Sequence, residues 1–270
     1  MGLGDDIMFL GEAERIYNQT GKTIRPIADS GKSVFYKNVP WLYEGGEISV
    51  NARDTDIKTD IHIKYYEKGR EKTSLGERMI FRAYQPKPFR VRLTHHEMDW
   101  ARTTLSNHNV KDEFLLVNPD YKDRFYSSNK NWGFEKYQEL TTMLSKDYHV
   151  VRILPGGTYN EPPLQDATNI KSEDVRKSVA IMSLASGAVG YDGLMNHITA
   201  GFEIPMVVIC GGLVDESIVG YETSEYIKYD HPQTPCGARY DCPHCLEANE
   251  KITVDMVYKK CHKLFYYKFL

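Results

Sequence analysis

The first candidate functional residues lie at the start of the sequence. The segment Gly2–Asp6 (Gly-Leu-Gly-Asp-Asp) predicts a turn that leads into a helical pattern over Ile7–Tyr17. Two glycines permit a tight turn and a close backbone approach to a ligand. A carboxylate at Asp5 or Asp6 could take a proton from a reacting hydroxyl group. The structural alternative is that one of these aspartates only caps the helix, which is the commonest reason for an aspartate at such a place.

Two further polar groups stand where apolar runs end. Lys130 lies in the loop that follows the run Glu113–Val117, and the segment Gly190–His197 joins another apolar run to the next helical pattern. A lysine near a helix N-terminus suits phosphate oxygens, and the free amides of a helix start can surround a diphosphate. Each feature alone has a structural explanation, namely a solvated lysine, a capping Asp192 and a packed His197. Three such loops at one sheet edge favour a ligand-binding site.

The elements that would bring these loops together are predicted best in the C-terminal half. Apolar runs alternate there with helical patterns, which indicates a parallel sheet with right-handed crossovers and a ligand site at its carboxyl edge. We expect a Rossmann-like domain over residues 112–270. The predicted strands are Glu113–Val117, Val150–Leu154, Ala188–Gly190 and Met206–Cys210, and the predicted helices are Phe134–Leu144, Ser172–Ala185 and Leu194–Phe202.

The N-terminal 111 residues are less regular. Beyond the helix at Ile7–Tyr17, strands are predicted at Ser33–Tyr36, Ile61–Tyr66 and Phe89–Leu93. The stretch Thr94–Val110, rich in His, Asn and Thr, is expected to be the domain boundary. The sequence therefore predicts a smaller domain over residues 1–111 that faces the C-terminal domain across a cleft.

Composition narrows the class of protein. The chain has 270 residues, 41% of them hydrophobic and 26% charged, and a formal net charge of −3, which together indicate a globular protein and exclude a uniformly basic nucleic-acid binder. Its apolar runs are shorter than the roughly 20 residues that span a bilayer. Two aspartates close behind Met1 do not fit a signal peptide. We therefore expect a soluble cytoplasmic protein.

Four of the five cysteines lie after residue 235, at Cys236, Cys242, Cys245 and Cys261. A structural zinc site would use four such ligands, with histidines also nearby. The spacing is irregular, however, and Cys261 falls on the apolar face of a predicted helix. The preferred interpretation is that these are packing cysteines and that the protein has no metal, with zinc at Cys236, Cys242 and Cys245 as the alternative.

The segment Arg78–Arg102 is rich in basic residues, among them Arg90 and Arg92. A solvated surface is the simpler explanation. The functional alternative is a groove for an anionic acceptor, either a phosphorylated glycan or a nucleic acid whose modified base is flipped out of the duplex.

In combination, these motifs resemble the heptosyltransferase-like glycosyltransferases, glycosyltransferase family 9. The resemblance is carried by Gly-Leu-Gly-Asp at the start, by Lys-x-Trp at Lys130–Trp132, by Val-Gly-x-Asp-x4-His ending at His197, and by the tail Pro235–Val254. It covers about residues 112–265 and, before them, residues 2–17.

The resemblance implies an α/β fold of two facing Rossmann-like domains, the GT-B arrangement. It implies an inverting, metal-independent transfer of a sugar from a nucleoside-diphosphate sugar to a hydroxyl acceptor, without a cofactor. By matching positions, Asp5 is the catalytic base, while Lys130, Asp192 and His197 bind the donor. We expect two more donor-binding residues, Gly193 and Leu194, and four on the acceptor side, Gly4, Asp6, Arg90 and Arg92.

Three departures from the family pattern keep a second interpretation open. Met1 stands where the family has a hydrophobic strand, so the first strand is absent or replaced by another segment. Gly193-Leu194 replaces the family's Thr-Gly, and the N-terminal domain is short. The alternative function is a catalytically degenerate module that binds a nucleotide or glycan without turnover. A nucleotide-sugar epimerase or dehydrogenase is disfavoured because the Gly-x-Gly-x-x-Gly fingerprint is missing.

The acceptor cannot be carried over from the family, because the short N-terminal domain is the one that normally binds it. A glycan such as a lipopolysaccharide core is the expected acceptor in a bacterium. A hydroxymethylated base of phage DNA, in an infected host, is the second expectation.

Overall fold

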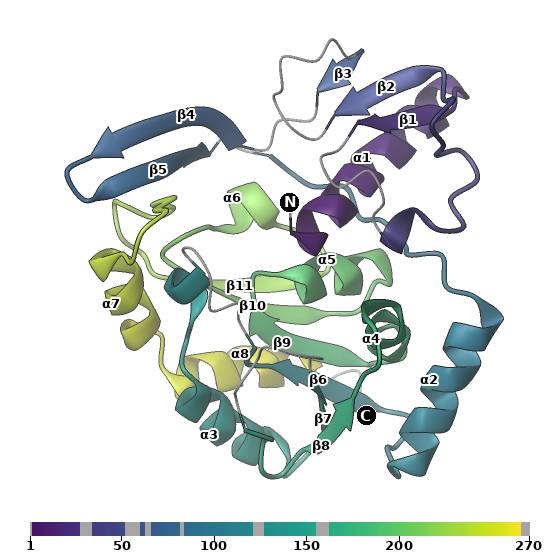
Figure 1. The fold of residues 1–270 in the computed structure, drawn as a ribbon. Coiled ribbons are helices and arrows are strands. Elements are labelled where there is room, and N and C mark those ends of the chain that lie inside the picture. Colours follow the sequence, from purple (N-terminus) through teal and green to yellow (C-terminus); the bar gives the residue numbers. More distant parts are fainter. Residues whose placement is uncertain are drawn as a thin grey trace.

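The computed structural model describes residues 2–27, 34–51, 60–62, 66–81, 84–120, 127–154 and 162–265. Its largest part is a parallel six-stranded sheet flanked by helices, and a smaller part at the N-terminus lies above one edge of that sheet (Figure 1). The predicted α/β class with a parallel sheet is confirmed.

The six-stranded sheet has the order β11-β10-β9-β6-β7-β8, with every neighbouring pair parallel. Four of its strands lie where apolar runs predict them, and β8 and β11 were not predicted, because they are short and partly polar. The strands are β6 (Phe114–Asn118), β7 (His149–Leu154), β8 (Thr168–Lys171), β9 (Gly187–Tyr191), β10 (Met206–Gly211) and β11 (Ser224–Lys228).

Helices cover both faces of this sheet, and the alternation of side chains along each strand explains why. In β6, Phe114 and Leu116 pack in the core under one set of helices, whereas Leu115 and Val117 pack in the core under the other. Strands buried on both faces read as continuous apolar runs, which is what made them predictable. The helices on the first face are α2 (His95–Asn107), α4 (Val175–Met182) and α5 (Leu194–Gly201), and those on the second are α3 (Phe134–Leu144) and α8 (Val254–Phe265).

The helix predictions need two adjustments in this half. Asp174, not Ser172, caps α4, because its carboxylate accepts the amide of Lys177 at 2.8 Å. The expected boundary Thr94–Val110 contains the capped helix α2, where Thr94 and Glu97 bond each other's backbone amides. This helix packs on α4.

The N-terminal part begins with α1 (Leu3–Thr20), followed by β1 (Ile24–Ile27), the 3-10 helix η1 (Val34–Tyr36), β2 (Ile48–Asn51) and β3 (Ile61–His62). The strands form a parallel three-stranded sheet in the order β1-β2-β3. A separate antiparallel hairpin, β4 (Tyr66–Thr73) and β5 (Gly76–Phe81), extends over the C-terminal part (Figure 1).

Sequence patterns predict this part less well. The predicted strand Ser33–Tyr36 is the helix η1, with Ser33 itself outside the described residues. The predicted strand Ile61–Tyr66 divides between β3 and the start of β4, and residues 63–65 lie outside the described part. Phe89–Leu93 is wrong as a strand: this segment is irregular, and Phe89 and Val91 are buried against α1 without a strand partner among the described residues.

The two parts share a hydrophobic core. Ile7 and Leu10 of α1 pack in one cluster with Val179 of α4 and Ile198 of α5. In Figure 1 the start of α1 lies directly above α5. Within the described residues, no helix is both long and apolar enough to cross a membrane.

Candidate functional site

The first turn of α1 contains the Gly-x-Gly-Asp motif. The helix begins at Leu3, with Gly2 as its N-cap. The predicted turn before the helix is therefore wrong, because Gly4 and Asp5 lie inside the helix. The Asp5 carboxylate accepts the Gly2 amide at 2.7 Å. Asp5 therefore stabilises the helix start from the N3 position, which is one of the roles of an acidic residue in a first turn.

Gly4 lies against His197 of α5. A Cβ atom at Gly4 would come within 2.7 Å of His197 Cδ2 and 3.0 Å of its Nε2, so only glycine lets α1 approach α5 this closely. The contact places the first turn of α1 beside the first turn of α5, since Leu194 N is 3.8 Å from the same point.

The loop after β6 meets the loop after β9 through an ion pair. Lys130, the last residue of the 3-10 helix η2 (Ser127–Lys130), donates to Asp192 Oδ2 at 2.5 Å and to the Asp192 carbonyl at 3.2 Å. The Asp192 side chain is 5% exposed and that of Lys130 is 22% exposed. The ammonium is thus paired with a buried carboxylate, while the Lys130 side chain as a whole stays partly exposed.

His197 and Asp192 influence each other's charge. Burial would raise the pKa of Asp192, but Lys130 and His197 outweigh it and the pKa is lowered. Burial lowers the pKa of His197 despite Asp192 and Asp5 nearby. The ring is therefore neutral near pH 7, and its Nδ1 is hydrogen-bonded to Tyr221 Oη at 2.8 Å.

Asp6 occupies a different environment from Asp5. Its side chain is buried, at 4% exposure, and its charge helps to raise the pKa of Tyr36 in η1, for which burial is the larger cause. The two adjacent aspartates thus face different surroundings, as a rotation of about 100° per helical residue requires.

Arg90 and Arg92 lie away from this group. The Arg92 guanidinium pairs with Glu14 of α1 at 3.5 Å, and Glu14 is about 13 Å along the helix axis from Asp5. The Arg90 guanidinium lies 5.2 Å from the ring centre of Phe202, at the far end of α5 from Gly193. Both arginines are exposed. Arg92 lies beside the second half of α1 and Arg90 beside the end of α5, apart from the group that the structure gathers: Gly4, Asp5, Lys130, Asp192, Gly193, Leu194 and His197.

Several neighbours of the site were not predicted. Tyr221 fixes the His197 ring, and Asn196 helps to lower the pKa of Asp192. Asp120, just after β6, pairs with Arg152 of β7 at 2.6 Å in the interior. The Tyr221–His197 and Asp120–Arg152 pairings join segments distant in the sequence, and the local signal for them was only Asp120 at the end of an apolar run.

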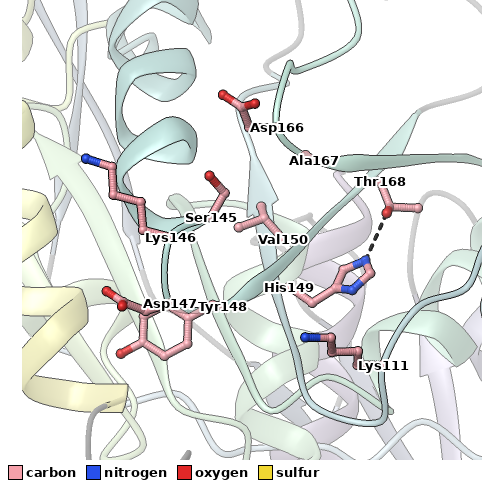
Figure 2. Close-up of a pocket in the computed structure, with 10 residues that line it drawn as sticks. All are labelled: Lys111, Ser145, Lys146, Asp147, Tyr148, His149, Val150, Asp166, Ala167 and Thr168. Carbon is pink, nitrogen blue, oxygen red and sulfur yellow. Dashed lines mark hydrogen bonds between the residues drawn. The ribbon is translucent and has the colours of Figure 1, made fainter.

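A surface hollow of about 490 Å³ lies elsewhere, around His149 and Thr168 (Figure 2). His149 Nε2 is hydrogen-bonded to Thr168 Oγ1 at 2.9 Å, and burial lowers the pKa of the ring. These residues begin β7 and β8, so the hollow is at the amino edge of the sheet. Ligands of such folds bind at the carboxyl edge, and we do not take this hollow as the functional site.

A cluster of three cysteines and one histidine lies near η2. The ligand atoms of Cys236, Cys242, His244 and Cys245 all lie within 4.8 Å of one another, and the four residues are buried. This group could hold a metal ion, with His244 as a member that the sequence did not single out. Cys261 is buried in the core beside α3, as expected.

Comparison with known proteins shows the fold. The structure resembles the crystal structure of a family 9 glycosyltransferase from Veillonella parvula, with a TM-score of 0.66, 11% identity, and coverage of 99% of this chain and 95% of that one. It also resembles the iron-containing dodecameric glycosyltransferase TibC from enterotoxigenic E. coli, with a TM-score of 0.62, 14% identity, and coverage of 99% and 74%.

The predicted resemblance to heptosyltransferase-like glycosyltransferases of family 9 is thus confirmed, at the level of the fold. No protein-family model matches the sequence, and no curated protein matches it.

Proposed function

We propose that this protein is a glycosyltransferase that transfers a sugar from a nucleoside-diphosphate sugar to an acceptor hydroxyl group, with inversion at the anomeric carbon. The observation that carries the proposal is that Lys130, Asp192 and His197 meet the first turn of α1 at the carboxyl edge of the parallel sheet. Ligands of open parallel sheets bind at this edge. The fold shared with family 9 glycosyltransferases supports sugar transfer.

The donor diphosphate would bind between Lys130 and the start of α5. The first amides of a helix have no acceptor within the helix and point outward, and here they belong to Leu194 and Met195 after the cap Gly193. The Lys130 ammonium donates to the Asp192 carboxylate at 2.5 Å, and Asp192 directly precedes the cap Gly193. Positive groups in this position stabilise the charge that develops on a departing diphosphate.

The acceptor hydroxyl would be deprotonated by Asp5. Inversion requires a single displacement, in which a base takes the acceptor proton while the oxygen attacks the anomeric carbon and the diphosphate leaves. Asp5 lies near enough to His197 to act on the charge of its ring, which supports a position beside the proposed donor site. The more deeply buried Asp6 is proposed to shape the acceptor side only.

We further propose that the chain forms two facing units, residues 1–111 and 112–270, with the acceptor held by the first. The parallel sheet β1-β2-β3 with α1 supports a small first unit, and α2 at its end packs on α4 of the second. We propose a glycan as acceptor. Arg90 stacks on Phe202 and Arg92 pairs with Glu14, both away from Asp5, so neither arginine is proposed to hold the reacting hydroxyl group.

Calorimetric titration with ADP, UDP and GDP tests the donor site. We expect one of the three to bind, and the matching sugar nucleotide then to be consumed when glycan acceptors are added. Binding without consumption of any sugar nucleotide would favour the alternative function, a catalytically degenerate module that binds a nucleotide or glycan without turnover. Absence of binding for all three would contradict the proposed function.

A further inference from the structure

We infer that Cys236, Cys242, His244 and Cys245 form a tetrahedral zinc site that fastens the segment 234–245 and, through Asn129, the loop that carries Lys130. The metal site rests on its own geometry. Only its connection to donor binding rests on the proposed function.

The donor set fits zinc. Four buried ligand atoms lie within 4.8 Å of one another, and the Sγ atoms of Cys236 and Cys245 are 3.2 Å apart. Tetrahedral zinc with Zn–S bonds of about 2.3 Å places its sulfur ligands about 3.8 Å apart, so small side-chain shifts close the site. Structural zinc sites use sets of three thiolates and one imidazole. Soft sulfur ligands also favour zinc over magnesium or calcium.

His244 is oriented as a metal ligand. Its Nδ1 is buried and makes no hydrogen bond of regular geometry among the described residues, although the ring interacts with the Cys236 thiol. Its Nε2 is 3.2 Å from Thr234 Oγ1. A ligating histidine commonly donates its second ring N–H to a neighbouring oxygen, which fixes the ring. Gly212 leaves space for this ring, because a Cβ there would come within 2.5 Å of His244 Cε1.

The surroundings favour the negative charge of three thiolates. Cys242 is the N-cap of α7 (Pro243–Lys251), and His244 and Cys245 lie in its first turn, where the helix dipole stabilises thiolates. The guanidinium of Arg78 interacts electrostatically with Cys236 and Cys242. The Sγ atoms of Cys236 and Cys245 share one hydrogen bond, whose proton a bound zinc ion would displace.

The site is connected to the Lys130 loop through a buried amide. Asn129 donates to the carbonyls of Ala238 and Tyr240 at 3.3 and 2.8 Å, and its Oδ1 accepts the amide of Cys242 at 3.0 Å. Asn129 precedes Lys130, whose ammonium pairs with Asp192. A metal that fixes Cys236 and Cys242 thereby fixes both sides of the Asn129 side chain and limits where Lys130 can reach.

Elemental analysis of the purified full chain tests the site directly. We expect about one zinc ion per chain, retained through gel filtration in the presence of a weak chelator. Cys242→Ser and His244→Ala should lose most of the zinc. Cys261→Ala is the matched control, because this buried cysteine lies in a different core cluster, and it should keep the zinc.

A second measurement does not depend on whether the variants fold. Wild-type protein stripped with a strong chelator and reloaded with Co²⁺ should show the charge-transfer absorption of cobalt thiolates. Under native conditions, a thiol-modifying mercurial should release one zinc ion per chain as three thiols react. A metal-free protein, iron in place of zinc, or a disulfide between Cys236 and Cys245 in the purified chain would each overturn the inference.

The connection to Lys130 has its own readout. Metal-stripped protein should bind the nucleoside diphosphate found by calorimetry at least tenfold more weakly, and Zn²⁺ should restore the affinity. If the zinc is present but its removal leaves that affinity unchanged, the proposed connection is wrong while the metal site stands. If no nucleoside diphosphate binds to the zinc-loaded protein, the proposed function fails and the metal content still decides the site.

Discussion

At the scale of single residues, the Lys130–Asp192 pair has two roles that can be separated. Lys130 is proposed to bind the diphosphate, but it also neutralises a carboxylate whose side chain is 5% exposed. Removing one partner of a buried pair leaves the other charge uncompensated, which is costly in itself. A loss of donor affinity in Lys130→Ala alone would therefore have two explanations.

The first prediction compares Lys130→Ala with the double variant Lys130→Ala/Asp192→Ala. Both should bind the nucleoside diphosphate about ten- to a hundredfold more weakly, because a charge-assisted hydrogen bond contributes roughly 1.5–3 kcal/mol. The double variant should regain thermal stability, since no buried charge remains unpaired. Recovery of full donor affinity in the double variant, measured by calorimetry, would show that Lys130 serves only to neutralise Asp192.

The second prediction concerns the two adjacent aspartates. Asp5→Asn retains the size of the side chain and an oxygen that can accept the Gly2 amide, so stability should change little. Loss of a general base should lower the rate of sugar transfer by about 10²–10⁴ while donor affinity is unchanged. Asp6→Asn is the control and should keep most of the rate. The assignment of the base is wrong if Asp6→Asn is inactive and Asp5→Asn is fully active.

At the scale of helices and strands, the critical contact is the approach of α1 to α5 at Gly4. The His197 ring that faces Gly4 is fixed by Tyr221 at 2.8 Å and cannot easily move aside. The spacing of the proposed base and the donor site therefore depends on the absence of one Cβ atom.

The third prediction is the effect of Gly4→Ala. Alanine favours a helix interior by about 0.8–1 kcal/mol over glycine, but a contact of 2.7 Å adds a packing cost of roughly 1–3 kcal/mol. We expect a net loss of about 0–2 kcal/mol in the free energy of unfolding and a clear loss of transfer rate. Asn18→Ala, on the exposed end of the same helix, is the control and should be neutral or stabilising in denaturant unfolding. A stabilised and fully active Gly4→Ala would contradict the close approach.

The same scale shows what sequence patterns could predict. Strands β6, β7, β9 and β10 are buried on both faces, so their apolar runs identify them. Phe89–Leu93 has the alternation of a strand, but its apolar side chains are buried because an extended segment lies against α1. In β1, only Ile24 is buried, which leaves too little pattern to detect a four-residue strand.

The residues of the candidate site also differ in how far the sequence could predict them. The proximity of Lys130, Asp192 and His197 could be predicted because each lies between an apolar run and the next helix or at a helix start, whereas their roles stay predictions. Tyr221 was not singled out, since its role depends on a hydrogen bond to His197 in another segment of the chain. His244 lies within the cysteine cluster, but its spacing did not distinguish it from the other histidines nearby. Sequence patterns report local burial, whereas the pairing of polar groups is set by the tertiary fold.

At the scale of the whole molecule, one buried arginine joins four segments. Arg176 of α4 donates to both carboxylate oxygens of Glu97 in α2, at 2.5 and 2.9 Å, and also to the carbonyls of Val34 and Arg92 at 3.0 and 2.8 Å. The side chains of Arg176 and Glu97 are only 9% and 11% exposed. The pair thus ties the N-terminal part to the helices that cover the large sheet.

The fourth prediction is that Glu97→Gln lowers the free energy of unfolding by about 3–5 kcal/mol, because it leaves Arg176 buried without its counter-charge. Glu14→Gln is the matched control, since Glu14 pairs with the exposed Arg92 at 3.5 Å. Such an exposed pair contributes about 0–1 kcal/mol. Denaturant unfolding at pH 7 measures both variants, and equal effects of the two would contradict a structural role for the buried pair.

The last prediction follows from the charge of Glu97. Its hydrogen bonds from Arg176 lower its pKa from 4.5 to about 2 in the folded protein. Unfolded chains then bind the proton at higher pH than folded ones, so the stabilisation is complete above about pH 4.5 and is lost as the pH falls toward 2. Wild-type melting temperature should decline over this window more steeply than that of Glu97→Gln, which lacks the titrating group. Parallel declines of the two proteins between pH 5 and pH 3 would show that other carboxylates, and not the bond between α2 and α4, govern acid unfolding.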